Sequence, residues 1–206
     1  NRAKPKIVFY GKELALDHSK YQPGQWIPFT APTAQDKEES EFFASLKRYS
    51  PVFQSPVAGK DDLSTHLFTS GTTGIPKAVV WTRAAVFYMP LEIIEGLKVT
   101  DKDIVLDYRA YSWSSPQVLS ILPSLVSGAT LVFGRRFSRT RFASWLKDYG
   151  ITICVGIPTV INFLLEEAVP LHKGDVPSLK FMTSSSAPLL VKNQLKFEEK
   201  YGIPIN

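Results

Sequence analysis

Short runs of apolar residues alternate along this chain with longer stretches in which apolar residues recur every three or four positions. Runs of the first kind predict buried strands, and stretches of the second kind predict amphipathic helices. Most of the runs are apolar on both faces, which is typical of a parallel sheet covered by helices on both sides. We therefore predict an α/β fold with a doubly wound, mostly parallel sheet. The predicted strands span 66–69, 78–82, 103–108, 130–133, 151–155 and 179–183, and the predicted helices span 83–98, 116–126, 138–149, 158–167 and 189–201.

The first 64 residues show a weaker pattern. Residues 6–10 predict a strand, and residues 36–49 predict a helix. The stretch 21–35 between them is rich in proline and predicts an irregular connection, as does the stretch 50–62. We assign residues 1–64 to an N-terminal segment and residues 65–206 to an α/β subdomain.

Composition narrows the class of protein. The 206 residues are 44% hydrophobic and 21% charged, as in a folded globular protein, and the formal net charge of +5 suits anionic ligands such as nucleotides. Cys154 is the single cysteine, so we expect no intramolecular disulfide and no cysteine-based metal site. It stands in an apolar run, where we expect it to be buried, and a reducing, cytoplasmic compartment fits. No run approaches the length of about 18 apolar residues that a membrane span requires.

The most informative segment is residues 69–77, which read TSGTTGIPK. Its glycines, Gly71 and Gly74, allow positive φ and a close approach of the backbone to a ligand. Four hydroxyl side chains add donors that can turn toward phosphate oxygens, Lys77 adds a positive charge, and the segment contains no acid. The spacing differs from the Walker loop, in which four residues separate the glycines and Ser or Thr follows the lysine. We predict an exposed anion-binding loop between two strands.

This segment resembles the phosphate loop of the adenylate-forming superfamily, whose signature is Thr-Ser-Gly-Thr-Thr-Gly-x-Pro-Lys, usually followed by glycine. Here Ala78 stands at that last position. The resemblance continues through the segments AYSW at 110–113, SGAT at 127–130, GIPT at 156–159 and SSSAPL at 184–189. It implies part of the large N-terminal domain of an acyl-CoA synthetase, which activates a carboxylic acid with ATP and then transfers it to a thiol.

The resemblance also implies roles for individual residues. Thr69 and Lys77 would act in catalysis, ATP, Mg²⁺ and coenzyme A would be the cofactors, and a small-molecule carboxylic acid would be the substrate. Trp113 replaces a histidine that is usual in the family, so the acyl pocket would differ in shape. The implied cofactor-binding residues are Thr69, Ser70, Gly71, Thr72, Thr73, Gly74, Lys77, Ser185, Ser186, Ala187 and Pro188. The implied substrate-binding residues are Trp113, Ser114, Gln117, Ile157, Pro158 and Thr159.

Simpler interpretations stand beside these. Residues 184–188 fit an ordinary strand-to-helix turn, and Trp113 and residues 157–159 fit core positions. The three histidines lie far apart in sequence without metal-ligand spacing, so we expect no protein-based metal site. Four arginines at 135–141 form the one basic cluster, which fits a solvated surface or a site for the phosphates of coenzyme A.

Two broader expectations complete the interpretation. Family members continue beyond the point matched by Asn206 with a Tyr-Gly-x-Thr-Glu motif and a mobile C-terminal domain that carries a catalytic lysine. We therefore expect these 206 residues by themselves to be inactive. The alternative function is a non-catalytic nucleotide- or nucleic-acid-binding module, although few aromatic residues are interleaved with the arginines. We expect no nucleic-acid partner, and a homodimer is compatible with the sequence.

Overall fold

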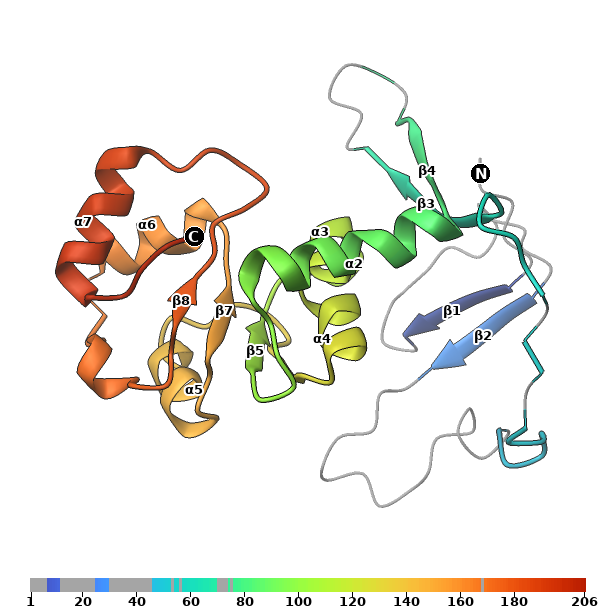
Figure 1. Cartoon of the computed structure of the whole chain (residues 1–206), viewed down its shortest axis with the longest axis horizontal. Coiled ribbons are helices and arrows are strands. Elements are labelled where there is room, and N and C mark those ends of the chain that lie inside the picture. Colours follow the sequence, from blue (N-terminus) through green and yellow to red (C-terminus); the bar gives the residue numbers. More distant parts are fainter. Residues whose placement is uncertain are drawn as a thin grey trace. The chain divides into compact units, whose positions relative to one another are not determined.

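The computed structural model describes residues 7–11, 25–29, 46–52, 54–55, 57–69, 74, 76–167 and 169–206. The chain divides into two compact units, Asn1–Val57 and Ala58–Asn206. The first unit contains a parallel pair of strands, β1 (Ile7–Gly11) and β2 (Gln25–Phe29) (Figure 1). The strand β2 corrects the prediction of an irregular connection over 21–35. Its residues QWIPF include strand-forming aromatic and β-branched types, and a proline is tolerated at the edge of a sheet.

The predicted helix at 36–49 lies outside the described residues as far as position 45. Residues 46–49 form a turn in which the Tyr49 N–H donates to the Leu46 carbonyl at 3.0 Å.

The second unit begins with a hairpin. The strands β3 (Leu63–Phe68) and β4 (Ala78–Thr82) pair antiparallel with each other, with a register irregularity between Leu63 and Thr65. The prediction that residues 69–77 connect two strands is confirmed. These two strands form a sheet of their own and do not join the parallel sheet.

A four-stranded parallel sheet forms the centre of the second unit. Its strands are β5 (Ile104–Asp107), β6 (Thr130–Phe133), β7 (Ile153–Val155) and β8 (Phe181–Met182), and their spatial order is β6-β5-β7-β8. All three neighbouring pairs are parallel, as the sequence predicts. A parallel bridge between Met182 and Ile205 extends the sheet at its β8 edge.

In the second unit, helical structure occurs at each of the five predicted places and in the predicted order, but two of the predicted helices differ in detail. The helix α5 (Phe142–Asp148) begins four residues later than predicted, because the Ser138 carbonyl accepts the N–H groups of both Arg141 and Phe142 in a preceding turn. The predicted helix at 116–126 consists of three pieces, α3 (Ser114–Pro116), a π-helical turn η2 (Gln117–Ile121) and α4 (Leu122–Ser127). The remaining helices are α2 (Arg83–Leu97), α6 (Pro158–Glu166), a short 3₁₀ turn η3 (Lys173–Asp175) and α7 (Val191–Tyr201).

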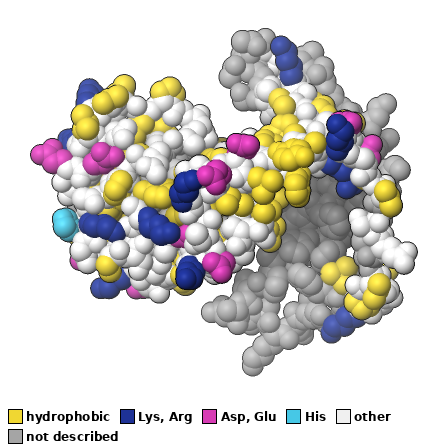
Figure 2. All heavy atoms as spheres, in the orientation of Figure 1, with side chains coloured by type: hydrophobic (Ala, Val, Ile, Leu, Met, Phe, Trp, Pro, Cys, Tyr) yellow, Lys and Arg dark blue, Asp and Glu magenta, His cyan; other side chains and the backbone are white. Residues whose placement is uncertain are grey.

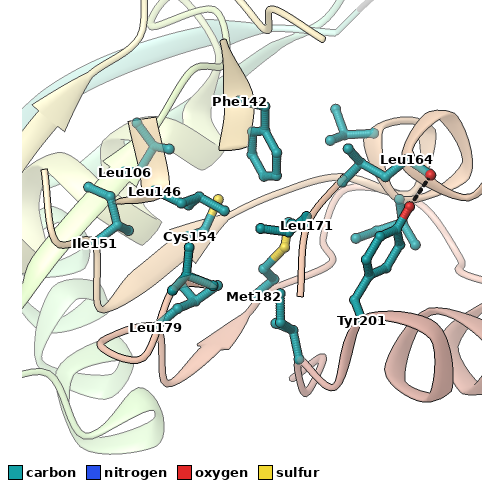
Figure 3. Packing of buried hydrophobic residues seen from close by; sticks show 14 of the residues in the cluster. Leu106, Phe142, Leu146, Ile151, Cys154, Leu164, Leu171, Leu179, Met182 and Tyr201 are labelled. Carbon is teal, nitrogen blue, oxygen red and sulfur yellow. Dashed lines mark hydrogen bonds between the residues drawn. The ribbon is translucent and has the colours of Figure 1, made fainter. Parts of the chain in front are cut away.

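Both faces of the sheet are covered by helices, which confirms the doubly wound prediction. Alternate residues of the strands point to opposite faces, so Leu106, Cys154 and Met182 lie in one apolar cluster with residues of α5, α6 and α7 (Figure 3). Val105, Ile153 and Val155 lie in the other, packed against α2 and η2. Full burial of such side chains stabilises a fold by about 1.5–3 kcal/mol each.

Other apolar side chains of the second unit stay exposed. Many of them belong to α2, α4 and the hairpin, and Figure 2 shows hydrophobic side chains gathered where Figure 1 places α2 and α4. The more exposed of them are Phe87, Tyr88, Leu125, Leu63 and Phe68. In the described part of the chain, no helix has the length and apolar character needed to cross a membrane.

Candidate functional site

The carboxyl edge of the parallel sheet collects several predicted site residues. The connection after β5 leads to η2 and α4 on the α2 face, whereas the connection after β7 leads to α6 on the opposite face. The switch point of the topology therefore lies between β5 and β7. Open parallel sheets bind their ligands at the carboxyl ends of the strands beside such a point.

A buried ion pair stands at the end of β5. The Asp107 carboxylate accepts hydrogen bonds from the Arg109 Nη2 at 2.7 Å, from Arg109 Nε at 3.0 Å and from the Arg109 N–H at 2.9 Å. The Ser120 hydroxyl of η2 donates to the same carboxylate at 2.5 Å. Asp107 is 0% exposed and Arg109 is 4% exposed. A charged pair at this depth is stable only when its hydrogen-bonding groups are satisfied, and here the carboxylate accepts four bonds.

The guanidinium group links this pair to a predicted ligand-binding turn. Arg109 Nη1 donates to the Ser185 hydroxyl at 3.3 Å. The Ser185 N–H in turn donates to the Gly156 carbonyl at 3.2 Å, and the Gly156 N–H donates to the Thr183 hydroxyl at 3.2 Å. Side-chain and backbone hydrogen bonds thereby connect the ends of β5, β7 and β8.

The backbone of this turn region is crowded at Gly156 and strained at Ser186. A Cβ atom added at Gly156 would lie 2.9 Å from the Thr183 carbonyl oxygen, so only glycine allows the two strand ends to approach so closely. Ser186 has φ of 72°, in the left-handed region that non-glycine residues seldom adopt. Strained backbone of that kind is concentrated at functional sites.

The segment after Arg109 carries the predicted acyl-pocket residues. The Tyr111 hydroxyl donates to the Asp107 carbonyl at 2.5 Å, and its ring packs edge-on against Phe133 with centroids 4.8 Å apart. Burial, followed by the nearby Asp107 charge, raises the Tyr111 pKa above its ordinary value, so this hydroxyl stays protonated. The Gln117 amide donates to the Tyr111 carbonyl at 3.4 Å, whereas the Trp113 side chain is 52% exposed.

The π-helical turn η2 completes this side of the site. The Ser120 hydroxyl bonds to both the Pro116 carbonyl at 2.7 Å and the Asp107 carboxylate. Pro123, which follows, has no N–H to continue the regular ladder. Turns of this kind inside helices are frequent at functional sites.

The hairpin carries the other group of predicted residues. The Thr69 N–H donates to the Lys77 carbonyl at 3.0 Å, and the Lys77 N–H donates to the Thr69 hydroxyl oxygen at 3.1 Å. Both side chains are exposed. The Thr69 hydroxyl accepts this bond and so keeps its own hydrogen for another acceptor. Within the described residues, no carboxylate forms an ion pair with the Lys77 ammonium group.

The tip of the hairpin is described in part. Gly74 has φ of 140° and no atom within 4 Å of the place where a Cβ would stand, so its backbone is open to an approaching group. The predicted residues Ser70, Gly71, Thr72 and Thr73 lie outside the described residues.

The AMP-binding enzyme family matches residues 1–206, the whole chain. The chain belongs to this family. Among individual relatives, the oxalate–CoA ligase of Arabidopsis thaliana is 31% identical over 147 residues, which cover 70% of this chain and 29% of that protein. Human long-chain fatty acid transport protein 1 is 28% identical over 119 residues, covering 58% of this chain and 18% of that protein. The chain thus spans less than a third of the length of these two relatives.

The fold is also that of known structures. The crystal structure of apo MatB from Rhodopseudomonas palustris superimposes with a TM-score of 0.82 at 20% sequence identity, and the match covers 98% of this chain and 39% of that one. At this sequence identity, the likeness shows only that the two chains share a fold. It confirms the predicted α/β fold.

In the present chain, the structure brings some of the predicted site residues together. Ser185 bonds both to Arg109 and to the Gly156 carbonyl, which directly precedes residues 157–159, and the segment holding Trp113, Ser114 and Gln117 follows the strand end that carries Arg109. Ala187, Pro188 and Thr159 are exposed, and Pro158 is buried as the first residue of α6. The assigned roles of these residues remain predictions.

The sequence reasoning missed Asp107 and Arg109. Their signal was a pair of opposite charges directly after the apolar run of β5, at the end of a central strand. Two charged residues at such a position are typical of a protein surface. The sequence does not identify their hydrogen-bond partners, Ser120 and Ser185.

Cys154 is buried and free, as expected. Burial, followed by the Asp107 charge, raises its pKa, so the thiol is neutral and unreactive. Within the described residues, no group of three His, Cys, Asp or Glu side chains is placed to hold a metal ion.

Proposed function

We propose that this chain belongs to an enzyme that joins a carboxylic acid to coenzyme A through an acyl-adenylate, and that residues 65–206 form its nucleotide- and acyl-binding subdomain. The observation that carries the proposal is the TSGTTGIPK segment at the end of an exposed hairpin, in a chain that matches the AMP-binding enzyme family throughout. In the proposed reaction the carboxylate attacks the α-phosphorus of ATP and releases pyrophosphate. A thiol then attacks the acyl carbon and releases AMP.

The described part of the hairpin fits a polyphosphate. Its side chains include a hydroxyl with a free hydrogen and an ammonium group, both exposed, and the segment contains no acid to repel phosphate. We infer that Thr69 and Lys77 hold the outer phosphates of ATP and spread the negative charge that develops on the departing pyrophosphate. Donors fixed in advance at such a place commonly supply a large part of a rate enhancement.

The carboxyl edge of the sheet would hold the adenylate. In the proposal the turn at 184–188 borders the adenine, and Trp113, Ser114, Gln117 and residues 157–159 border the acyl group. Arg109 links the two parts because it bonds to Ser185 and also fixes Asp107, which accepts from Ser120 and whose carbonyl accepts from Tyr111. A rigid frame of this kind holds reacting groups in one relative position.

The cofactors and setting are part of the proposal. We propose that Mg²⁺ binds together with the phosphates of ATP, as is usual for this ion. A cytoplasmic location fits the single buried thiol. A homodimer is the assembly to be tested by light scattering of the purified protein.

The acid is to be found by experiment. The relatives' names include oxalate and long-chain fatty acids, and a tryptophan with half its surface exposed at position 113 would shape the entrance of the pocket. We propose a test by acid-dependent exchange of labelled pyrophosphate into ATP, using the full-length protein and a panel from oxalate to long-chain fatty acids. At least one acid should support exchange, and thioester formation should require coenzyme A.

The same assay can also contradict the proposal. A full-length protein that binds ATP but exchanges pyrophosphate with none of the acids would contradict the proposal and favour the non-catalytic nucleotide-binding module. Family membership argues against that alternative.

A further inference from the structure

The Arg109 guanidinium group lies between two segments that carry predicted ligand-binding residues. On one side, its Nε and Nη2 atoms donate to the two oxygens of the Asp107 carboxylate at 3.0 Å and 2.7 Å. On the other side, its Nη1 atom donates to the Ser185 hydroxyl at 3.3 Å. One planar group therefore contacts two segments that are far apart in the sequence.

The Arg109 side chain is too deeply buried to bind a substrate directly. It is 1% exposed, and the Asp107 carboxylate beside it is 0% exposed and balances its charge. A group that binds a carboxylate or a phosphate has to offer accessible donors and a positive charge. Any effect of Arg109 on the reaction must therefore pass through the residues that it holds.

The first segment that Arg109 holds is the turn at 184–188, which is the predicted neighbour of the adenine. Besides accepting from Arg109, the Ser185 hydroxyl donates to the Gly156 carbonyl at 3.4 Å, and the Ser185 N–H donates to the same carbonyl at 3.2 Å. The next residue, Ser186, is exposed and has φ of 72°. Such a conformation persists at a non-glycine residue only where its surroundings determine it, and the bonds of Ser185 supply that constraint on one side.

The second segment is 110–121, which carries predicted acyl-pocket residues. The Ser120 hydroxyl donates at 2.5 Å to Asp107 Oδ2, the same oxygen that accepts from Arg109 Nη2. The Tyr111 hydroxyl donates to the Asp107 carbonyl at 2.5 Å. The carboxylate can hold Ser120 here only while Arg109 balances its charge, because a buried carboxylate without a counter-ion is unstable.

We propose that Arg109 is a positioning residue with two separable arms. Its bond to Ser185 sets the turn at 184–188 for the nucleotide, and its pair with Asp107 sets the segment 110–121 for the acid. This inference rests on the proposed function. Both segments are then in place before the ligands arrive, so that binding costs less conformational entropy. When one arm is lost, the ligand on that side has to order its own segment, and its affinity falls.

Two substitutions cut the arms one at a time. Ser185→Ala removes the hydroxyl that Arg109 contacts on the nucleotide side, and Ser120→Ala removes the hydroxyl that bonds to Asp107 on the acid side. Both leave the ion pair in place, so the fold should survive, which urea unfolding checks. Arg109→Lys keeps the charge but loses the planar fork of donors, so it weakens both arms.

The measurement is pyrophosphate exchange by the full-length protein, with ATP and the acid that wild type uses best in a panel from oxalate to long-chain fatty acids. Ser185→Ala should raise KM for ATP by about three- to tenfold and leave KM for the acid within about twofold of wild type. Ser120→Ala should do the reverse, and Arg109→Lys should raise both constants. At saturation with both ligands kcat should change less than KM, because the bound ligands order the segments themselves.

Ser124→Ala is the matched control for Ser120→Ala. Ser124 is 3% exposed and lies four residues further along the same helical stretch. Among the described residues, its hydroxyl has no hydrogen-bond partner. The substitution therefore removes a buried hydroxyl without cutting a bond to Asp107, and both KM values should stay at those of wild type.

A merely structural role of Arg109 predicts a different result. Loss of stability would reduce the amount of folded enzyme, and hence the rate, without separating the two KM values. The inference would be overturned if either Ser185→Ala or Ser120→Ala raised both constants equally or raised neither, or if Arg109→Lys left both unchanged. A wild-type protein that binds ATP but exchanges pyrophosphate with none of the acids would instead refute the proposed function.

Discussion

The β3–β4 hairpin and the carboxyl edge of the parallel sheet both carry predicted site residues, but they hold them differently. At the edge, Asp107 and Arg109 are buried, and the hydrogen bonds from Arg109 to Ser185 and from Gly156 to Thr183 help to connect the ends of three strands. On the hairpin, Thr69 and Lys77 are exposed and are joined to each other by two hydrogen bonds, one between backbone groups and one from the Lys77 N–H to the Thr69 hydroxyl.

This difference in burial and hydrogen bonding suits two different functional roles. Residues that hold a base or an acyl group in place gain from rigid partners, and buried charges need such partners to exist at all. Residues that hold phosphates must stay accessible, and few buried contacts leave a loop free to adjust. Substitutions at the edge should therefore reduce stability, and substitutions on the hairpin should reduce activity with little loss of stability.

The largest effect on stability is expected for Arg109→Ala. It leaves the Asp107 carboxylate buried without its counter-ion, and removal of one partner of such a pair costs about 3–5 kcal/mol. Urea unfolding measures the change, with Arg83→Ala as a control because that arginine is exposed on α2. If both variants unfold at the same urea concentration, the ion pair does not stabilise the edge.

A second expectation concerns the opposite, amino edge of the sheet. Burial alone would raise the Asp103 pKa, but hydrogen bonds from Lys180, Thr152 and Thr100 outweigh it and lower the pKa to about 2 from 3.8. A lowered pKa means that the ionised group stabilises the folded state above pH 4 and loses this effect as the pH falls toward 2. Asp103→Asn should cost about 2 kcal/mol at pH 7.

The pH dependence provides the check. The difference in unfolding free energy between wild type and Asp103→Asn should shrink to about half near pH 3 and nearly vanish at pH 2. A difference that stays constant with pH would mean that the charge of Asp103 is not the cause.

The sequence predicted the parts of this molecule that depend on local pattern. Strands buried on both faces appear as apolar runs, so β5, β6, β7 and the two-sided cover of the sheet were recognised. The strand β2 was missed because proline-rich sequence usually marks a connection. The start of α5 was misplaced because Ser138 looks like an N-cap, whereas its carbonyl closes a separate turn.

The buried network could not be predicted, because its members are distant in sequence. Ser120 lies 13 residues from Asp107, and Ser185 lies 76 residues from Arg109. No local period connects them, and a pair of charges after a strand is typical of a surface. The loop at 69–77, in contrast, was recognised because all of its chemistry is contained in nine consecutive residues.

The smallest effect is expected for Ser185→Ala. The substitution removes a hydroxyl that accepts from Arg109 Nη1 at 3.3 Å and donates to the Gly156 carbonyl at 3.4 Å. Both hydrogen bonds are long, and only one of them involves a charged group. Their loss should therefore lower the unfolding free energy by about 1 kcal/mol. Ser178→Ala, at an exposed serine outside the network, is the control. If both substitutions change the unfolding free energy equally, the Ser185 hydroxyl does not stabilise the carboxyl edge.

The central claim is that the hairpin serves the first chemical step, and Lys77→Ala in the full-length protein tests it most directly. Single-turnover kinetics should separate adenylate formation from thioester formation started with supplied acyl-adenylate. The first step should slow by about ten- to a thousandfold, because one donor to the developing charge is lost, and ATP affinity should fall by less. The second step should be nearly unchanged, because pyrophosphate has already left, and Lys102→Ala should affect neither step. Equal losses in both steps, or an unchanged first step, would contradict the account.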